Sequence, residues 1–108
     1  MDIRSVQKLA WDNKVAKGFN TTDVPLEFCL LTGEVAEAFD SWRKGQADVA
    51  EELADAAIFL VGLAEMVGAD LQDAVVAKLA ANEVRVYHPL SNGVLVKAQQ
   101  LGLAGNTS

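Results

Sequence analysis

The fold is decided by residues 34–55, which read EVAEAFDSWRKGQADVAEELAD. Two acidic pairs, Glu34 with Glu37 and Glu52 with Asp55, flank a polar turn in this stretch. Carboxylates three residues apart lie on the same face of a helix, one turn above the other. Because so short a connection makes two helices antiparallel neighbours, we expect the four carboxylates to converge on one pocket.

Carboxylates that converge in this way call for a compensating positive charge. Two like charges a few ångströms apart repel by roughly 3–4 kcal/mol at an effective dielectric constant of about 20, which favours a bound cation or raised pKa values. Acidic residues at helical spacing are ordinarily solvated, but here they extend apolar stripes that contain Leu30, Phe59 and Met66. All four candidate ligands are hard oxygen donors, so the cluster predicts Mg²⁺ or Mn²⁺ rather than Zn²⁺.

The composition indicates one globular domain, residues 1–108, with an all-α fold. Hydrophobic residues make up 51% of the chain, as in globular rather than disordered proteins. The length is enough to bury one modest core. Pro25 and Pro89 are the only prolines, and the long segments that they leave uninterrupted favour helices.

Charge and apolar content exclude several classes of partner. The net charge of −6 argues against a nucleic acid, because binding one needs a basic surface. The longest apolar run, residues 56–64, is about half of what a membrane span requires, so no membrane partner is expected. Cys29 is the single cysteine, which rules out an intrachain disulfide and fits a reducing cytoplasm.

Apolar periodicity predicts two helices between the start of the chain and the polar turn. The first covers residues 3–17 and ends at Gly18, a residue type typical of helix ends. Asp23 is the start signal of the second helix, Pro25 lies in its opening turn, and the helix stops near Gly45.

Two further helices are predicted after the turn. Asp48 is the expected cap of the third, with Glu51 as the returning partner of a capping box. Asp70 is the expected cap of the fourth, which covers residues 71–87. Its inward-facing side is expected to consist of Leu71, Val75, Leu79 and Val86.

The third helix predicts an oligomer, and the end of the chain predicts a non-helical tail. From Ile58 to Val67 the helix is apolar almost all round, which is typical of a buried element. Since so short a chain has little to cover it, we expect an antiparallel bundle of about four helices that is completed by oligomerisation. In the tail, residues 88–108, Asn92-Gly93 indicates a turn or short hairpin, followed by a frayed end from Gly102.

A second polar group lies on the fourth helix. Lys78, Asn82 and Arg85 follow one another at offsets of four and three residues, and therefore share one face. Such a face is often simply solvated. Two cations with an amide between them are also suited to phosphate oxygens and a sugar or base, which beside a metal cluster describes a nucleotide site.

These motifs together resemble the MazG-like, all-α nucleoside triphosphate pyrophosphohydrolases. The resemblance covers roughly residues 26–87 and combines the two acidic pairs with Gly68-Ala-Asp70-Leu71 and Lys78-x-x-x-Asn82-x-x-Arg85-x-Tyr87. Gly33 stands where many members have a further glutamate. The tail lies outside the resemblance.

The resemblance implies an enzyme that hydrolyses a (deoxy)nucleoside triphosphate to the monophosphate and pyrophosphate, in nucleotide-pool house-cleaning. It implies that Mg²⁺ is held by Glu34, Glu37, Glu52 and Asp55. The chemistry of phosphoryl transfer also calls for a group that accepts the proton of the attacking water, and among the four acids we expect Glu37 or Glu34 to do so. The resemblance further implies phosphate contacts from Lys78 and Arg85, a nucleoside contact from Asn82, and a homodimer or homotetramer.

Two other hypotheses remain open at this point. One is a non-catalytic helical interaction module whose acidic cluster binds a divalent ion. The other is a purely structural helical oligomer. The face formed by Lys78, Asn82 and Arg85 separates them from the enzyme, because a structural oligomer has no need of it.

Overall fold

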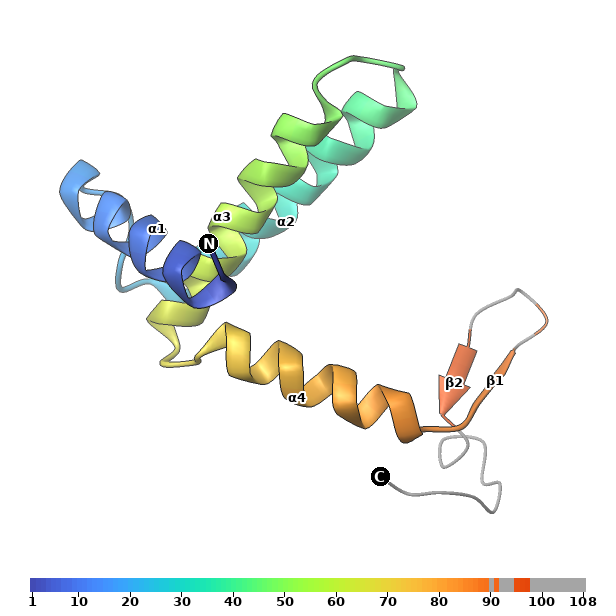
Figure 1. Cartoon of the computed structure of the whole chain (residues 1–108). Helices are drawn as coiled ribbons and strands as arrows, with labels where there is room; N and C mark the ends of the chain where they lie inside the picture. The colour runs from blue at the N-terminus through green and yellow to red at the C-terminus, as the bar shows by residue number, and fades with distance from the viewer. Residues whose placement is uncertain (90, 92–94, 98–108) are drawn as a thin grey trace. The chain divides into compact units, whose positions relative to one another are not determined.

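The computed structural model (Figure 1) describes residues 1–89, 91 and 95–97. The elements follow in the order α1, α2, α3, α4, β1 and β2. The chain divides into two compact units, Met1–Gln72 and Asp73–Ser108, which are described separately. None of the described helices is both long enough and apolar enough to cross a lipid bilayer.

Helix α1, Ile3–Lys17, has the expected bounds. The Asp2 carboxylate caps it by accepting a hydrogen bond of 2.8 Å from the Ser5 backbone N–H. Gly18 ends it with a φ of 74°, in the left-handed region that glycine adopts without a steric cost. The predicted range of this helix and its predicted end at Gly18 are therefore confirmed.

Helix α2, Val24–Arg43, also begins and ends where the sequence predicts. The Asp23 carboxylate accepts a hydrogen bond of 3.1 Å from the Leu26 backbone N–H, and Pro25 lies in the first turn. Lys44 is the last residue of the helical turn, and Gly45 follows with a positive φ.

Helix α3, Val49–Met66, begins at the expected place, but the predicted capping box is wrong. Asp48 makes no side-chain hydrogen bond to the start of the helix. Its carboxylate instead accepts a hydrogen bond from the hydroxyl of Ser41, which is buried at the end of α2. The buried Ser41 hydroxyl thus takes the Asp48 carboxylate in place of the backbone N–H groups at the start of α3. Glu51, the other residue of the predicted capping box, is exposed.

In the first unit, α2 and α3 run antiparallel along each other and α1 packs on α3 (Figure 1). The expected antiparallel packing of the two helices joined by the polar turn is therefore confirmed. The buried apolar core is small and is supplied mainly by α3, which buries Val61, Leu63 and Ala64, with Ala38 from α2. Ile58 and Leu60 of α3, in contrast, remain 50% and 43% exposed.

Helix α4, Leu71–Val84, is shorter than the expected range of 71–87. It contains no buried residue, and the prediction that Leu79 and Val86 face inward is wrong, because they are 63% and 43% exposed. An apolar stripe marks a side that can be buried, but burial requires a second apolar surface against it.

Two strands, β1 (Tyr87–Pro89) and β2 (Leu95–Lys97), pair antiparallel after α4, with Tyr87 opposite Lys97. Apart from them the described elements are helices, so the predicted all-helical architecture of about four helices is confirmed. The predicted turn at Asn92-Gly93 and the predicted frayed end from Gly102 lie outside the described residues.

Candidate metal centre and adjoining pocket

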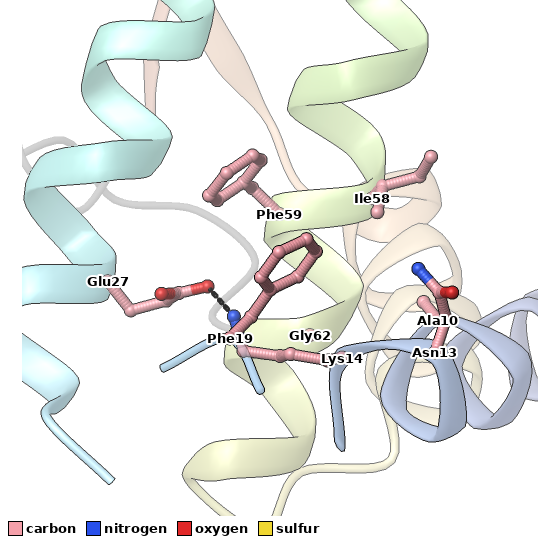
Figure 2. A pocket seen from close by; sticks show the side chains of 8 residues that line it. All are labelled: Ala10, Asn13, Lys14, Phe19, Glu27, Ile58, Phe59 and Gly62. Atoms are coloured by element: carbon pink, nitrogen blue, oxygen red, sulfur yellow. Dashed lines mark hydrogen bonds and ion pairs between the residues drawn. The ribbon is translucent and has the colours of Figure 1, made fainter. Parts of the chain in front are cut away.

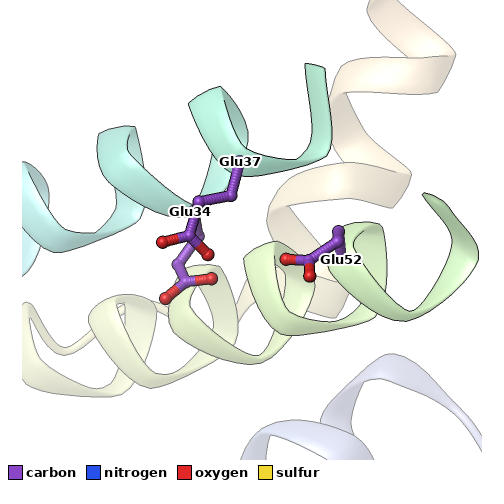
Figure 3. A group of neighbouring side chains, drawn as sticks. All are labelled: Glu34, Glu37 and Glu52. Carbon is purple, nitrogen blue, oxygen red and sulfur yellow. The ribbon is translucent and has the colours of Figure 1, made fainter. Parts of the chain in front are cut away.

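Three of the four predicted carboxylate ligands come together between α2 and α3. Glu34 and Glu37 project from α2 and Glu52 from α3 (Figure 3). One carboxylate oxygen of each lies within 4.8 Å of the others. The spacing of three residues on α2 and the short antiparallel connection to α3 are sufficient to produce this convergence.

Asp55 lies outside this group of three, although it is close enough to act on it electrostatically. It is exposed on α3, one turn beyond Glu52. Its negative charge is among the causes that raise the pKa of both Glu34 and Glu52. The structure thus places Asp55 beside the cluster rather than within it.

Burial and like charge raise the pKa of two members of the cluster. For Glu34 the largest cause is partial burial, followed by the charges of Glu37 and Asp55 and a hydrogen bond with the Glu37 carboxyl. For Glu52 partial burial again raises the pKa most, followed by the charges of Asp48, Glu37 and Asp55. Either a proton or a cation relieves this repulsion.

An unsatisfied oxygen shows that the cluster suits a cation. Oε2 of Glu52 is buried and has no hydrogen-bond partner among the described residues. A buried polar atom without a partner is costly and calls for an explanation. Together with the purely carboxylate character of Glu34, Glu37 and Glu52, this orphaned oxygen fits coordination of a hard divalent cation.

The predicted phosphate-binding residues belong to the second unit, whereas the acidic cluster belongs to the first. Lys78 and Asn82 are exposed on α4, one turn apart. Arg85 follows the end of the helix, and its Nη1 donates a hydrogen bond of 3.2 Å to Oδ1 of Asn82. The structure therefore brings the amide and the guanidinium together.

A buried ion pair between α1 and α2 is not predicted by the sequence patterns. Lys14 of α1 is 9% exposed and Glu27 of α2 is fully buried. Lys14 Nζ lies 2.5 Å from Glu27 Oε2, and Asn20 Nδ2 donates to Glu27 Oε1 at 3.2 Å. One signal could have indicated it: Glu27 lies seven residues before Glu34, on the same face of the helix.

This ion pair borders a pocket among α1, α2 and α3 (Figure 2). The pocket has about 360 Å³ of empty space, part of it open to solvent. Lys14 Nζ lies 5.8 Å from the centroid of the Phe59 ring, within the range of a cation–π contact. The lining residues are Ala10, Asn13, Lys14, Phe19, Glu27, Ile58, Phe59 and Gly62.

Comparisons of the chain with models of protein families, with curated proteins and with solved structures find no match.

Proposed function

We propose that this protein is a Mg²⁺-dependent hydrolase that converts (deoxy)nucleoside triphosphates to monophosphates and pyrophosphate. The observation that supports the proposal best is the convergence of Glu34, Glu37 and Glu52. Within this cluster, Oε2 of Glu52 is buried and has no hydrogen-bond partner among the described residues. Removal of non-standard or surplus nucleotides from the cytoplasm is the role that this activity would serve.

In this proposal Glu34, Glu37 and Glu52 hold the cation, and Asp55 contributes a fourth carboxylate from the next turn of α3. A bound Mg²⁺ or Mn²⁺ neutralises phosphate charge and lowers the pKa of a coordinated water. Either Glu34 or Glu37 accepts the proton of the water that attacks the α-phosphorus. The bond between the α-phosphorus and the bridging oxygen then breaks, and pyrophosphate leaves.

Lys78, Asn82 and Arg85, in the second unit, are the proposed substrate-binding residues. The two cationic side chains bind phosphate oxygens, which would otherwise be repelled by a chain of net charge −6. Asn82 already accepts a hydrogen bond from Arg85. This contact orients the guanidinium, and in the proposal the Asn82 side chain contacts the nucleoside.

The proposed enzyme is a homo-oligomer, either a dimer or a tetramer. Its support is a second, strongly apolar groove between α2 and α3, lined by Val35, Ala38, Phe39, Trp42, Val49, Leu53 and Ala56. Phe39, Trp42 and Leu53 are 58%, 67% and 57% exposed. A contiguous exposed apolar surface of this kind is typical of an interface between proteins.

The test combines metal-dependent melting with pyrophosphate release from a panel of ribo- and deoxyribonucleoside triphosphates. Wild-type protein is expected to melt several degrees higher in millimolar Mg²⁺ than in EDTA, since one ion at a hundredfold excess over its Kd stabilises by about 2.7 kcal/mol. Pyrophosphate is expected only with Mg²⁺ or Mn²⁺.

Two variants and a control separate the roles of the residues. Glu52→Gln is expected to abolish turnover and the Mg²⁺ shift, while Glu51→Gln, an exposed neighbour, keeps both. Arg85→Ala is expected to keep the Mg²⁺ shift and to weaken transition-state binding by about 1.5–3 kcal/mol. Full activity of Glu52→Gln would contradict the proposal, and a Mg²⁺ shift without any pyrophosphate would favour the non-catalytic metal-binding module.

A further inference from the structure

The buried Lys14–Glu27 pair needs an explanation other than stability. Glu27 is fully buried and Lys14 nearly so. A buried ion pair rarely stabilises a fold more than a well-packed apolar pair of similar volume. A pair retained at the edge of a pocket is therefore better explained by something that the pocket binds.

The arrangement of the pair leaves the ammonium group, not the carboxylate, to face a ligand. Both Glu27 oxygens accept hydrogen bonds, from Lys14 and from Asn20, and the residue has no exposed surface. The Lys14 side chain is 11% exposed and Glu27 takes one of its three N–H donors. Glu27 thus positions Lys14, whose remaining donors can reach the pocket.

The walls of the pocket suit a flat ring. The rings of Phe19 and Phe59 both line the pocket together with Lys14 (Figure 2), and aromatic side chains bind the faces of bases. The empty space of about 360 Å³ includes open solvent at the mouth of the pocket, so the enclosed part is smaller and suits one ring system rather than a whole nucleotide. Asn13, also in the lining, adds an amide.

The pocket lies at a suitable distance from the acidic cluster. On α2, Glu27 precedes Glu34 by seven residues, and on α3, Phe59 follows Glu52 by seven. Because the helices run antiparallel, both intervals lead the same way along the seam between them. Seven residues span about 10 Å of helix, comparable to the reach from an α-phosphate to the far side of its base.

We infer that this pocket binds the nucleobase of the substrate and that Lys14 selects a base with a carbonyl oxygen over one with an amino group at the same ring position. The inference rests on the proposed function for the identity of the ligand. An ammonium group only donates hydrogen bonds, so an amino group in place of the carbonyl leaves it unpaired. A preference of about tenfold or more follows from one such charged hydrogen bond.

The test uses pairs of nucleotides in which an amino group replaces the carbonyl and the adjacent ring nitrogen loses its hydrogen: guanosine with 2,6-diaminopurine riboside, and uridine with cytidine. Binding of the monophosphates is measured by calorimetry in EDTA, and kcat/KM for pyrophosphate release is measured with the triphosphates in Mg²⁺. The carbonyl member is expected to be preferred about tenfold or more in both measurements, for whichever ring size binds. Equal affinity within each pair would overturn the inference.

Paired variants test whether Lys14 is responsible. Lys14→Met with Glu27→Leu removes both charges together and is expected to reduce the preference to about twofold or less, while the Mg²⁺ melting shift remains. Should that protein not fold, Lys14→Gln with Glu27→Gln keeps hydrogen bonds at both positions and is expected to lose the preference, because a glutamine amide both donates and accepts. Lys17→Met, at an exposed lysine of α1, is the control.

The results distinguish this inference from the proposed function. A carbonyl preference in monophosphate binding without any pyrophosphate release would refute the proposed hydrolase activity, but it would support the assignment of the pocket to a nucleobase. Pyrophosphate release without a carbonyl preference, or with a preference that survives the loss of Lys14, would refute the pocket assignment alone.

Discussion

Glu52 is half-buried and combines three properties: a raised pKa, like charges around it and a buried oxygen without a partner among the described residues. Glu34, across the seam on α2, has a pKa raised in the same direction. Groups whose pKa values are perturbed by burial and by neighbouring charge are common at functional sites. Each also makes the stability of the metal-free protein depend on pH.

The sign of that dependence follows from linkage. Glu34 and Glu52 have folded-state pKa values above their ordinary value of 4.5, so the folded protein binds more protons than the unfolded chain between pH 4.5 and the raised values. Their contribution to stability is fully present below pH 4.5 and is lost as the pH rises through the folded pKa. In EDTA, the melting temperature is therefore expected to be higher near about pH 5 than near about pH 8.

Thermal melts of wild-type protein and Glu52→Gln across this range check the expectation. The variant lacks one titrating group and one repulsive charge, so its melting temperature in EDTA is expected to be higher at neutral pH and to change less with pH. Glu51→Gln, at an exposed position, serves as the comparison. A wild-type melting temperature that rises from pH 5 to pH 8 in EDTA would contradict this account of the cluster.

At the scale of single elements, local chemistry accounts for the first two helices. Asp2 and Asp23 cap α1 and α2, and Gly18 ends α1 in the left-handed region. These signals are short-range, so tertiary contacts did not alter them. The start of α3 differs because Ser41, a residue of the neighbouring helix, is the partner of Asp48.

Two glycine substitutions are expected to act in opposite directions. Gly18→Ala puts a Cβ on a residue with φ of 74° and is expected to destabilise by about 1 kcal/mol. Gly33→Ala lies within α2, where a Cβ meets nothing within 4 Å, and is expected to stabilise by up to about 1 kcal/mol. Urea unfolding in EDTA measures both, and a destabilised Gly33→Ala would show that this position is closely packed in an assembly.

At the scale of the whole molecule, more large apolar side chains are exposed than are buried among the described residues. The buried apolar residues of the described chain are Ala38, Val61, Leu63 and Ala64. Phe39, Trp42, Leu53 and Ile58 are each half exposed or more. Because burial of apolar surface is the main favourable term in folding, we expect the missing cover to come from another copy of the chain.

Light scattering at micromolar concentration tests this expectation and should give the mass of a dimer or tetramer. Leu53→Lys puts a charge into the apolar groove of α2 and α3 and is expected to weaken association by about tenfold or more. Val15→Lys, at a position of α1 that is equally exposed and outside that groove, is expected to leave the mass unchanged. A stable wild-type monomer would contradict the prediction.

Much of this molecule could be predicted from local sequence signals. The bounds of α1 and α2 follow from caps and glycines, and the convergence of Glu34, Glu37 and Glu52 follows from helical spacing with a short turn. In both cases the deciding interactions join residues that are close in sequence, or helices whose antiparallel packing a short connection dictates.

Other features were decided only by tertiary structure. The Lys14–Glu27 pair, the exchange of partners at Asp48 and the place of Asp55 beside the cluster depend on which faces of separate helices meet. Sequence periodicity defines an apolar or polar face, but the rotation of one helix against another is set by the packing of side chains along the whole contact. That packing brought a lysine of α1 to a glutamate of α2, whose side chains on their own helices resemble solvated charges.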